Sequence, residues 1–315
     1  MARSSSPARE KVTGVRTRTG RLLAGAAIVV ALVSGCGSTP SKVDAAAVIG
    51  DDTVTLSDVQ PRITAALARP DLVSTLKSQG YGPPDIGRAI VSQVVLHDLL
   101  GRAAAQQQIV VSDDEVNAAI AQAGGEQVLA QSTLDAGGVR ERITDQLIAT
   151  KLAEREIDRL SVTADIAVVQ SRDEALTLAR AIAAGGPAAD RALATAATAQ
   201  RNQQIRPATT PQAAATPLIG IPAGSTAAFP ISSQQGWVVV RVTERRTDAP
   251  PAGPATASRL DPQTLSEAGI RLLTPVAAQA GVEVSPRYGT WDPVTLSVVP
   301  NADQAGELLP SASAG

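Results

Sequence analysis

The strongest constraint on the fold is a change of hydrophobic period at Ser161. After it, the β-branched run 162–169 predicts a strand, and 237–243 predicts a second one. Before it, apolar residues recur at helical spacing, which predicts helices over 56–69, 86–106, 113–123 and 139–160. The sequence therefore predicts an α+β fold that is mainly helical, in which a helical domain precedes a small α/β domain.

Three capping boxes fix where helices begin. They are TLSD at 55–58, SDDE at 112–115 and SRDE at 171–174. The helix predicted over 86–106 is apolar on more than one side, which is typical of a helix buried at the centre of its domain. Residues 201–217 contain three prolines and few apolar side chains, so we expect a loop there.

The amino terminus has the pattern of a bacterial export signal. Six basic residues within 1–21 precede twelve apolar or small residues at 22–33, a run too short to span a bilayer comfortably. The segment ending at Cys36 resembles a lipobox, which implies that Cys36 becomes the lipid-modified first residue and that palmitate or a similar acyl chain anchors it. A plain secretory signal, or an uncleaved anchor with an incidental cysteine, is the alternative.

The predicted organisation follows from these patterns. It comprises a signal peptide at 1–35, a lipidated tether at 36–44, the helical domain at 45–160, the α/β domain at 161–247, a linker at 248–260, a C-terminal helix and strand at 261–300 and a disordered tail at 301–315.

Composition excludes several function classes. The chain has one cysteine, which rules out an internal disulfide framework, and one histidine, which rules out mechanisms that need two imidazoles. Aromatic residues make up 2%, too few for base-stacking platforms. Without 1–35 the chain keeps 22 basic and 29 acidic residues, so we expect no nucleic-acid partner.

Several short motifs, in their order along the chain, resemble those of the SurA and PrsA type of periplasmic foldase-chaperone. AAVIGDDTVTLSDV, QQIVVSDDEVNAAI and RERITDQLIATKLAEREI are similar to its helical chaperone domain. ADIAVVQSRDEALTLARAIAAGG and IPAGSTAAFPISSQQGWVVVRVTERR are similar to the first and last thirds of a parvulin prolyl isomerase domain. The resemblance covers about 45–247 and implies that the C-terminal segment packs back on the helical domain.

The parvulin-like part departs from its family at the expected catalytic positions. Asp165 stands where the family has its first histidine, and GWVV at 236–239 replaces the segment with the second. The central Gly-rich segment has no counterpart. We therefore expect a degenerate domain that is not an enzyme, with a parvulin-type isomerase as the alternative.

The remaining candidate residues favour structural roles. His97 lies in the apolar helix without a second histidine, so a hydrogen-bonded structural histidine is favoured over a metal ligand. Asp113, Asp114 and Glu115 fit helix-start electrostatics better than a calcium loop. Trp237, Tyr288 and Trp291 are expected in the core, although they could line a groove. We predict no catalytic residue, metal or cofactor.

These observations favour a lipid-anchored chaperone on the extracytoplasmic face of the bacterial cell membrane. Its partners would be unfolded or nascent exported polypeptides, bound without ATP, with the membrane reached through the lipid anchor. A scaffold lipoprotein with one dedicated partner is a further alternative. The predicted client-binding surface comprises Ile63, Leu67, Ile90, Val94, Ile143 and Leu147.

Overall fold

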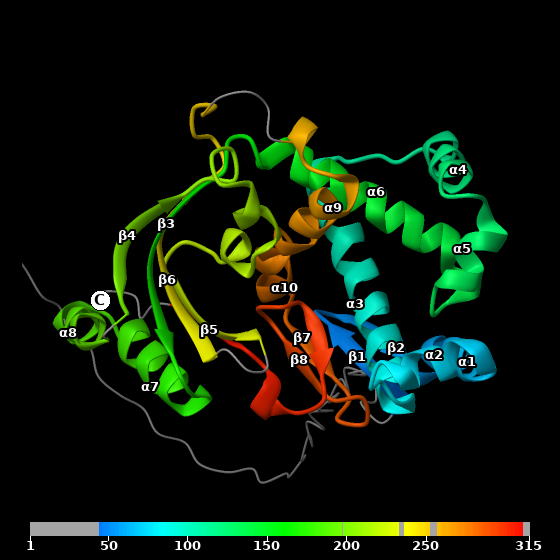
Figure 1. Cartoon of the computed structure of the whole chain (residues 1–315), viewed down its shortest axis with the longest axis horizontal. Coiled ribbons are helices and arrows are strands. Elements are labelled where there is room, and N and C mark those ends of the chain that lie inside the picture. Colours follow the sequence, from blue (N-terminus) through cyan, green and yellow to red (C-terminus); the bar gives the residue numbers. More distant parts are fainter. Residues whose placement is uncertain (1–43, 197, 233–235, 253–256, 311–315) are drawn as a thin grey trace, which may run out of the picture. The chain divides into compact units, whose positions relative to one another are not determined.

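The computed structural model describes residues 44–196, 198–232, 236–252 and 257–310, and these begin with a hairpin (Figure 1). Strand β1 (Ala45–Ile49) pairs antiparallel with β2 (Asp52–Thr55), and Gly50 makes the turn with a φ of 61°. Strand β7 (Val282–Val284) pairs with the other edge of β1. The start of the described chain is thus joined to a segment more than two hundred residues later.

Helices follow the hairpin, and capping places their starts. Thr55 and Ser112 form the capping boxes of α1 and α4. The helix predicted over 56–69 ends at Leu67, because Pro70 begins a separate helix, α2. The sequence analysis did not predict α2, nor did it predict α5. The elements of this region are α1 (Leu56–Leu67), α2 (Pro70–Ser78), α3 (Pro83–Gln107), α4 (Asp113–Gln122), α5 (Glu126–Ser132), the 3₁₀ turn η2 (Ala136–Gly138) and α6 (Val139–Glu156).

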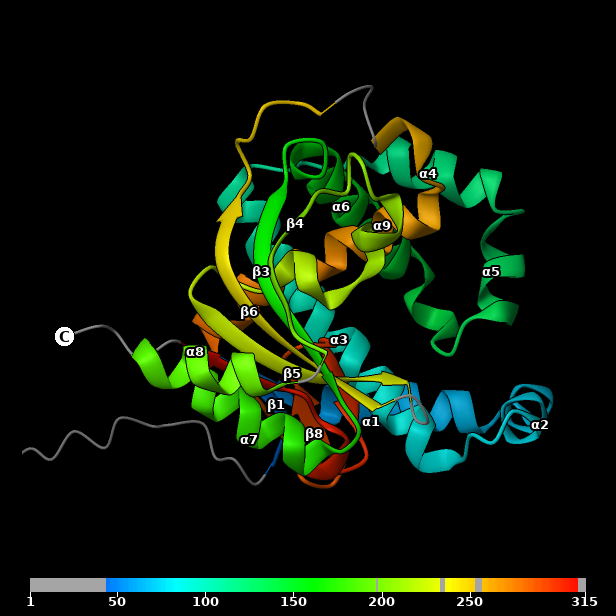
Figure 2. The ribbon, with the colours of Figure 1, turned by 60° about the vertical axis from the view of Figure 1, so that its left-hand side comes forward.

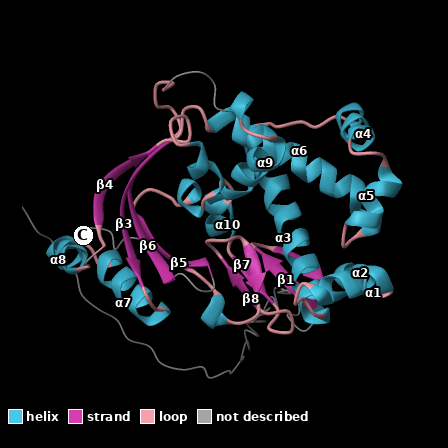
Figure 3. Cartoon of the chain, viewed as in Figure 1, coloured by secondary structure: helices cyan, strands magenta, loops and turns pink. Residues whose placement is uncertain are grey.

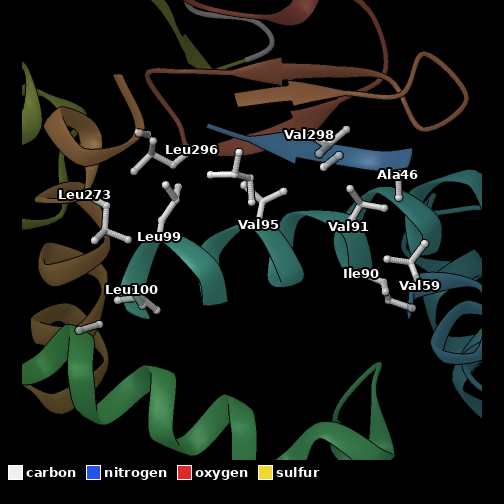
Figure 4. Packing of buried hydrophobic residues seen from close by; sticks show 14 of the residues in the cluster. Ala46, Val59, Ile90, Val91, Val95, Leu99, Leu100, Leu273, Leu296 and Val298 are labelled. Carbon is white, nitrogen blue, oxygen red and sulfur yellow. The ribbon is translucent and has the colours of Figure 1, made fainter. Parts of the chain in front are cut away.

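Helix α3 lies at the centre of the first hydrophobic core. Val91, Val95 and Leu99 are fully buried on it, and they face Ala46, Leu296 and Val298 from the hairpin and the C-terminal segment (Figure 4). Ile90 packs beside Val59 of α1 on another side of the helix. The expectation that this helix is buried on two sides is confirmed.

An antiparallel five-stranded sheet forms the second region, in the order β10-β5-β6-β3-β4. Helices α7 (Arg172–Ala183) and α8 (Gly186–Thr195) pack against it, and Figures 1 and 3 show them beside the strands. The strands are β3 (Ser161–Val169), β4 (Gln200–Ile205), β5 (Ser225–Ser232), β6 (Gly236–Arg246) and β10 (Glu307–Pro310).

Two sequence expectations are wrong in this region. Residues 200–205 form an edge strand although their side chains are polar, because β3 supplies the backbone partners. Residues 301–310 are not a disordered tail, since they form η6 (Ala302–Gln304) and then β10, which pairs with β5. Polar or short strands carry little hydrophobic pattern, so both were hidden in the sequence.

The opposite face of the sheet is covered by the chain itself. Two 3₁₀ turns, η3 (Pro211–Ala215) and η4 (Pro217–Gly220), join helix α9 (Pro262–Arg271) in a second core with Val162, Phe229 and Val240. The short turn η5 (Ala257–Arg259) precedes α9. The fold is therefore α+β, with a helical N-terminal region and a small sheet-containing region, as predicted.

The C-terminal segment connects the two regions. Helix α9 lies against α6 (Figure 2), and the contact is so close that a Cβ on Gly269 would stand 1.8 Å from the Ala149 carbonyl oxygen. Helix α10 (Thr274–Ala280) and the strands β8 (Thr290–Asp292) and β9 (Ser297–Val299) continue onto the first core.

Candidate functional site

A cleft of about 480 Å³ opens between the helical region and the C-terminal helix α9. Its walls come from α1, α3 and α6, from α9, and from the connection between α5 and α6. The lining residues are Arg62, Gln93, Leu96, Leu100, Thr133, Asp135, Gly138, Glu141, Arg142, Asp145, Gln146, Gln263, Ser266, Glu267 and Ile270.

The cleft combines an apolar part with amide side chains. Leu96 and Leu100 lie one turn apart on α3, and Ile270 comes from α9. Gln93, Gln146 and Gln263 supply side-chain amides, each of which can both donate and accept hydrogen bonds. Such a lining can bury apolar side chains and also satisfy a peptide backbone.

Arg62 organises the charges on one side of the cleft. Its guanidinium donates to both carboxylate oxygens of Glu141, at 2.7 and 3.0 Å, and lies 3.1 Å from an oxygen of Asp135. The hydrogen bond from Arg62 lowers the pKa of Glu141 below its ordinary value. Glu141 is therefore ionised at neutral pH. Arg62 forms ion pairs with the carboxylates of both Glu141 and Asp135.

A second pair is formed by His97 and Asp145, whose Nδ1 and Oδ1 atoms are 2.8 Å apart. This hydrogen bond raises the pKa of His97, even though partial burial opposes the rise. His97, Asp145 and Glu141 bring ligand atoms within 4.8 Å of one another, a spacing compatible with a metal ion. Because Arg62 already binds both oxygens of Glu141, a metal would have to displace that ion pair.

The predicted client-binding residues are placed very differently by the fold. Ile63, Ile90 and Ile143 are buried in the cores, because their side chains lie on the inward faces of α1, α3 and α6. Leu67 is 39% exposed, and Val94 and Leu147 are half-buried. The structure therefore leaves Leu67, Val94 and Leu147 as the accessible members of this set.

In the sheet region, Asp165 forms an ion pair. Its carboxylate is 1% exposed, lies 2.6 Å from Nη2 of Arg241 and accepts a hydrogen bond from the Asn202 backbone nitrogen at 2.9 Å. The guanidinium carbon of Arg172 lies 6.0 Å from the centre of the Trp237 ring. Asp165, which stands where the resemblance places the first histidine, is thus held in an ion pair, and Trp237 of the 236–239 segment lies beside Arg172.

The other single residues also have structural partners. The hydroxyl of Tyr288 accepts a hydrogen bond from Gln60, and Trp291 packs against the first core. Glu115 closes the capping box with Ser112 and pairs with Lys151 at 2.5 Å, which lowers the pKa of Glu115 to about 2. Asp113 lies 3.6 Å from Arg140 across to α6.

Sequence reasoning missed the wall of the cleft that α9 provides. Gln263, Ser266, Glu267 and Ile270 recur at helical spacing in the helix predicted from Asp261, and this spacing was the available signal. The resemblance implied that the C-terminal segment packs back on the helical domain, but it did not indicate that this face of α9 would lie opposite α3 and α6.

Two predictions fall on the amino-terminal segment. Cys36 and the proposed signal peptide lie outside the described residues. Within the part of the chain that the structure describes, no helix is both long and apolar enough to cross a membrane.

A comparison with known protein families finds a match in the helical region. Residues 15–127 match the family model of the SurA-like N-terminal domain. This match confirms the resemblance to a SurA-type helical domain seen in the sequence motifs of the region. The sheet region, from Ser161 onward, lies outside the matched residues.

Three solved structures are similar at low identity. PrsA from Bacillus subtilis is 14% identical, with 74% of this chain and 91% of that chain covered and a TM-score of 0.23. The peptidylprolyl isomerase PrsA from Bacillus cereus is 12% identical, with 79% and 96% covered and a TM-score of 0.24. That from Bacillus anthracis is 15% identical, with 62% and 99% covered and a TM-score of 0.24. Among curated proteins, no sequence matches the chain.

Proposed function

We propose that this protein is an extracytoplasmic chaperone that holds unfolded exported polypeptides in the cleft between α3, α6 and α9. The observation that carries the proposal is the lining itself, in which Leu96, Leu100 and Ile270 lie among three glutamine amides. The SurA-like N-terminal domain, whose helices supply part of this lining, supports the same role.

The chemistry of the lining suits many clients instead of one. An extended segment needs apolar contacts for alternate side chains and hydrogen-bond partners for its backbone. Glutamine side chains can rotate to serve either a donor or an acceptor, so no particular register is required. Binding of this kind needs neither ATP nor a cofactor. Leu67, at the end of α1, adds an exposed apolar side chain outside the cleft lining.

Aggregation suppression tests the proposal. The mature chain with Cys36→Ser would be added to a chemically unfolded client diluted into buffer, without ATP. We expect suppression near stoichiometric ratios, and its loss in a Leu96→Gln/Ile270→Gln variant. Val110→Gln/Val128→Gln is the matched control, because both valines are exposed and outside the cleft lining. A folded wild-type sample without effect at large excess would contradict the chaperone function.

We also infer that Cys36 carries a lipid and retains the protein at the membrane. The support is the sequence order of basic region, apolar run and a single cysteine. Palmitate labelling in a bacterial host should mark the wild type and not Cys36→Ser, and the variant should leave the membrane fraction. Equal labelling of both would contradict the anchor.

A dedicated scaffold would use the same cleft for one partner. Affinity capture from membranes separates the two functions. A broad set of exported proteins, lost in the Leu96→Gln/Ile270→Gln variant, supports the chaperone, whereas one stoichiometric partner supports the scaffold.

A further inference from the structure

Carboxylates outnumber guanidinium groups in the cleft. Among the described residues that line it, the acids are Asp135, Glu141, Asp145 and Glu267, and the arginines are Arg62 and Arg142. With four acids and two arginines, the formal charge of the lining is negative whether or not the neighbouring His97 is protonated. A cleft lined by an excess of one sign of charge attracts groups of the opposite sign.

Two of these acids form ion pairs with an arginine, and among the described residues the other two form none, although the charge of Glu267 acts on nearby Arg271. Arg62 pairs with Glu141 and Asp135. Asp145 instead pairs with His97, which is neutral once deprotonated, and Glu267 accepts a hydrogen bond from the neutral amide of Gln263 at 3.0 Å. The side chain of Asp145 is only 17% exposed, so water compensates its charge poorly.

The apolar part of the cleft complements this charge. Leu96 and Ile270 line the same space as Asp145 and Glu267. Arginine and lysine side chains bury their methylene stems on apolar surface while the charged end seeks an acid. A basic side chain therefore satisfies both features of the lining, whereas an acidic side chain would face like charges.

We infer that the cleft selects client segments that carry an arginine or lysine among apolar residues, through Asp145 and Glu267. The inference rests on the proposed function, since it specifies which segments the cleft holds. It extends that function from general apolar binding to charge-selective binding.

Fluorescence anisotropy with labelled peptides tests the selectivity on the full chain in detergent. The peptides share one extended apolar sequence and differ at the central residue, which is arginine, citrulline or glutamate. Citrulline keeps the shape of arginine without its charge. We expect the arginine peptide to bind about threefold or more tightly than the citrulline peptide, with the advantage shrinking as salt is raised. The glutamate peptide should bind most weakly.

Matched variants assign the effect to its residues. Asp145→Asn/Glu267→Gln should remove the advantage of the arginine peptide over the citrulline peptide. Glu154→Gln/Glu244→Gln removes the same formal charge from exposed positions on α6 and β6, and should keep the advantage.

Each contrary outcome has a distinct meaning. If the wild type binds the arginine and citrulline peptides equally, the selectivity is overturned and the chaperone function stands. If it binds neither, both are overturned. If Asp145→Asn/Glu267→Gln still prefers arginine, the assignment to these two acids is overturned, and the wild-type comparison holds even where a variant fails to fold.

Discussion

At the scale of single residues, the His97–Asp145 pair links stability to pH. His97 faces Asp145 and Glu141, which favour its charged form, and Arg62, which opposes it. Because the pKa of His97 is raised by folding, the pair stabilises fully below the ordinary value of about 6.5 and loses its effect as pH rises through the folded-state pKa.

The corresponding prediction uses His97→Gln, which cannot titrate. The wild type should exceed the variant in free energy of unfolding most at about pH 5, and the difference should shrink toward about pH 8. Urea unfolding at several pH values measures it. A difference that does not change with pH would contradict the linkage.

Arg62 provides a second prediction at this scale. Arg62→Met leaves Glu141 and Asp135 without their shared cation in a half-buried position, so we expect a loss of about 1 kcal/mol of stability, since solvent screens part of the effect. Adding Glu141→Gln should recover part of that loss, because the unpaired charge is removed. Thermal or urea unfolding of both variants measures this. A double variant less stable than Arg62→Met would contradict the explanation.

At the scale of elements, the crossing of α6 and α9 depends on one missing side chain. Gly269 has no Cβ, and only this lets α9 approach Ala149 closely enough to form the cleft wall. Gly269→Ala should cost about 2 kcal/mol or more by overpacking and should weaken client binding, because Glu267 and Ile270 shift with the helix.

Gly101→Ala is the matched control for this prediction. Gly101 lies in α3 with open space where a Cβ would stand, so alanine there should be neutral or stabilising by up to about 1 kcal/mol. Urea unfolding compares the two variants. If both alanines have the same effect, the close approach is not what limits stability.

At the scale of the whole molecule, both faces of the five-stranded sheet are covered by other elements of the chain. Helices α7 and α8 pack on one face, and η3, η4 and α9 on the other. A prolyl ring would need an open apolar cradle, and Asp165 is engaged by Arg241. We expect a cis–trans assay on a proline peptide to give the uncatalysed rate, and a clear acceleration would contradict this.

The C-terminal segment also contributes buried residues to both hydrophobic cores. Leu273 and Val298 belong to the first core, and Leu265 and Val294 to the second. A chain ending at Pro250 should lose cooperative unfolding, because both cores would lose buried side chains. Calorimetry of the shortened chain checks it, and an unchanged single transition would show that cooperative unfolding does not depend on the C-terminal segment.

The sequence by itself determined part of the local structure of this protein. Capping boxes at Thr55, Ser112 and Ser171 located helix starts, and the β-branched run after Ser161 located the first sheet strand. The resemblance of the helical region to the SurA type of chaperone domain was also visible in the sequence motifs. These features depend on neighbouring residues, so a linear pattern records them.

Only the tertiary structure decided the cleft and its charges. Arg62 and Glu141 are 79 residues apart, and Glu267 reaches the same cleft from the C-terminal segment. Whether Ile90 was core or client surface was equally undetermined, because an apolar helix face looks the same in either role. These outcomes depend on which elements pack together. Gly269 shows that a single absent side chain can decide whether two helices pack closely.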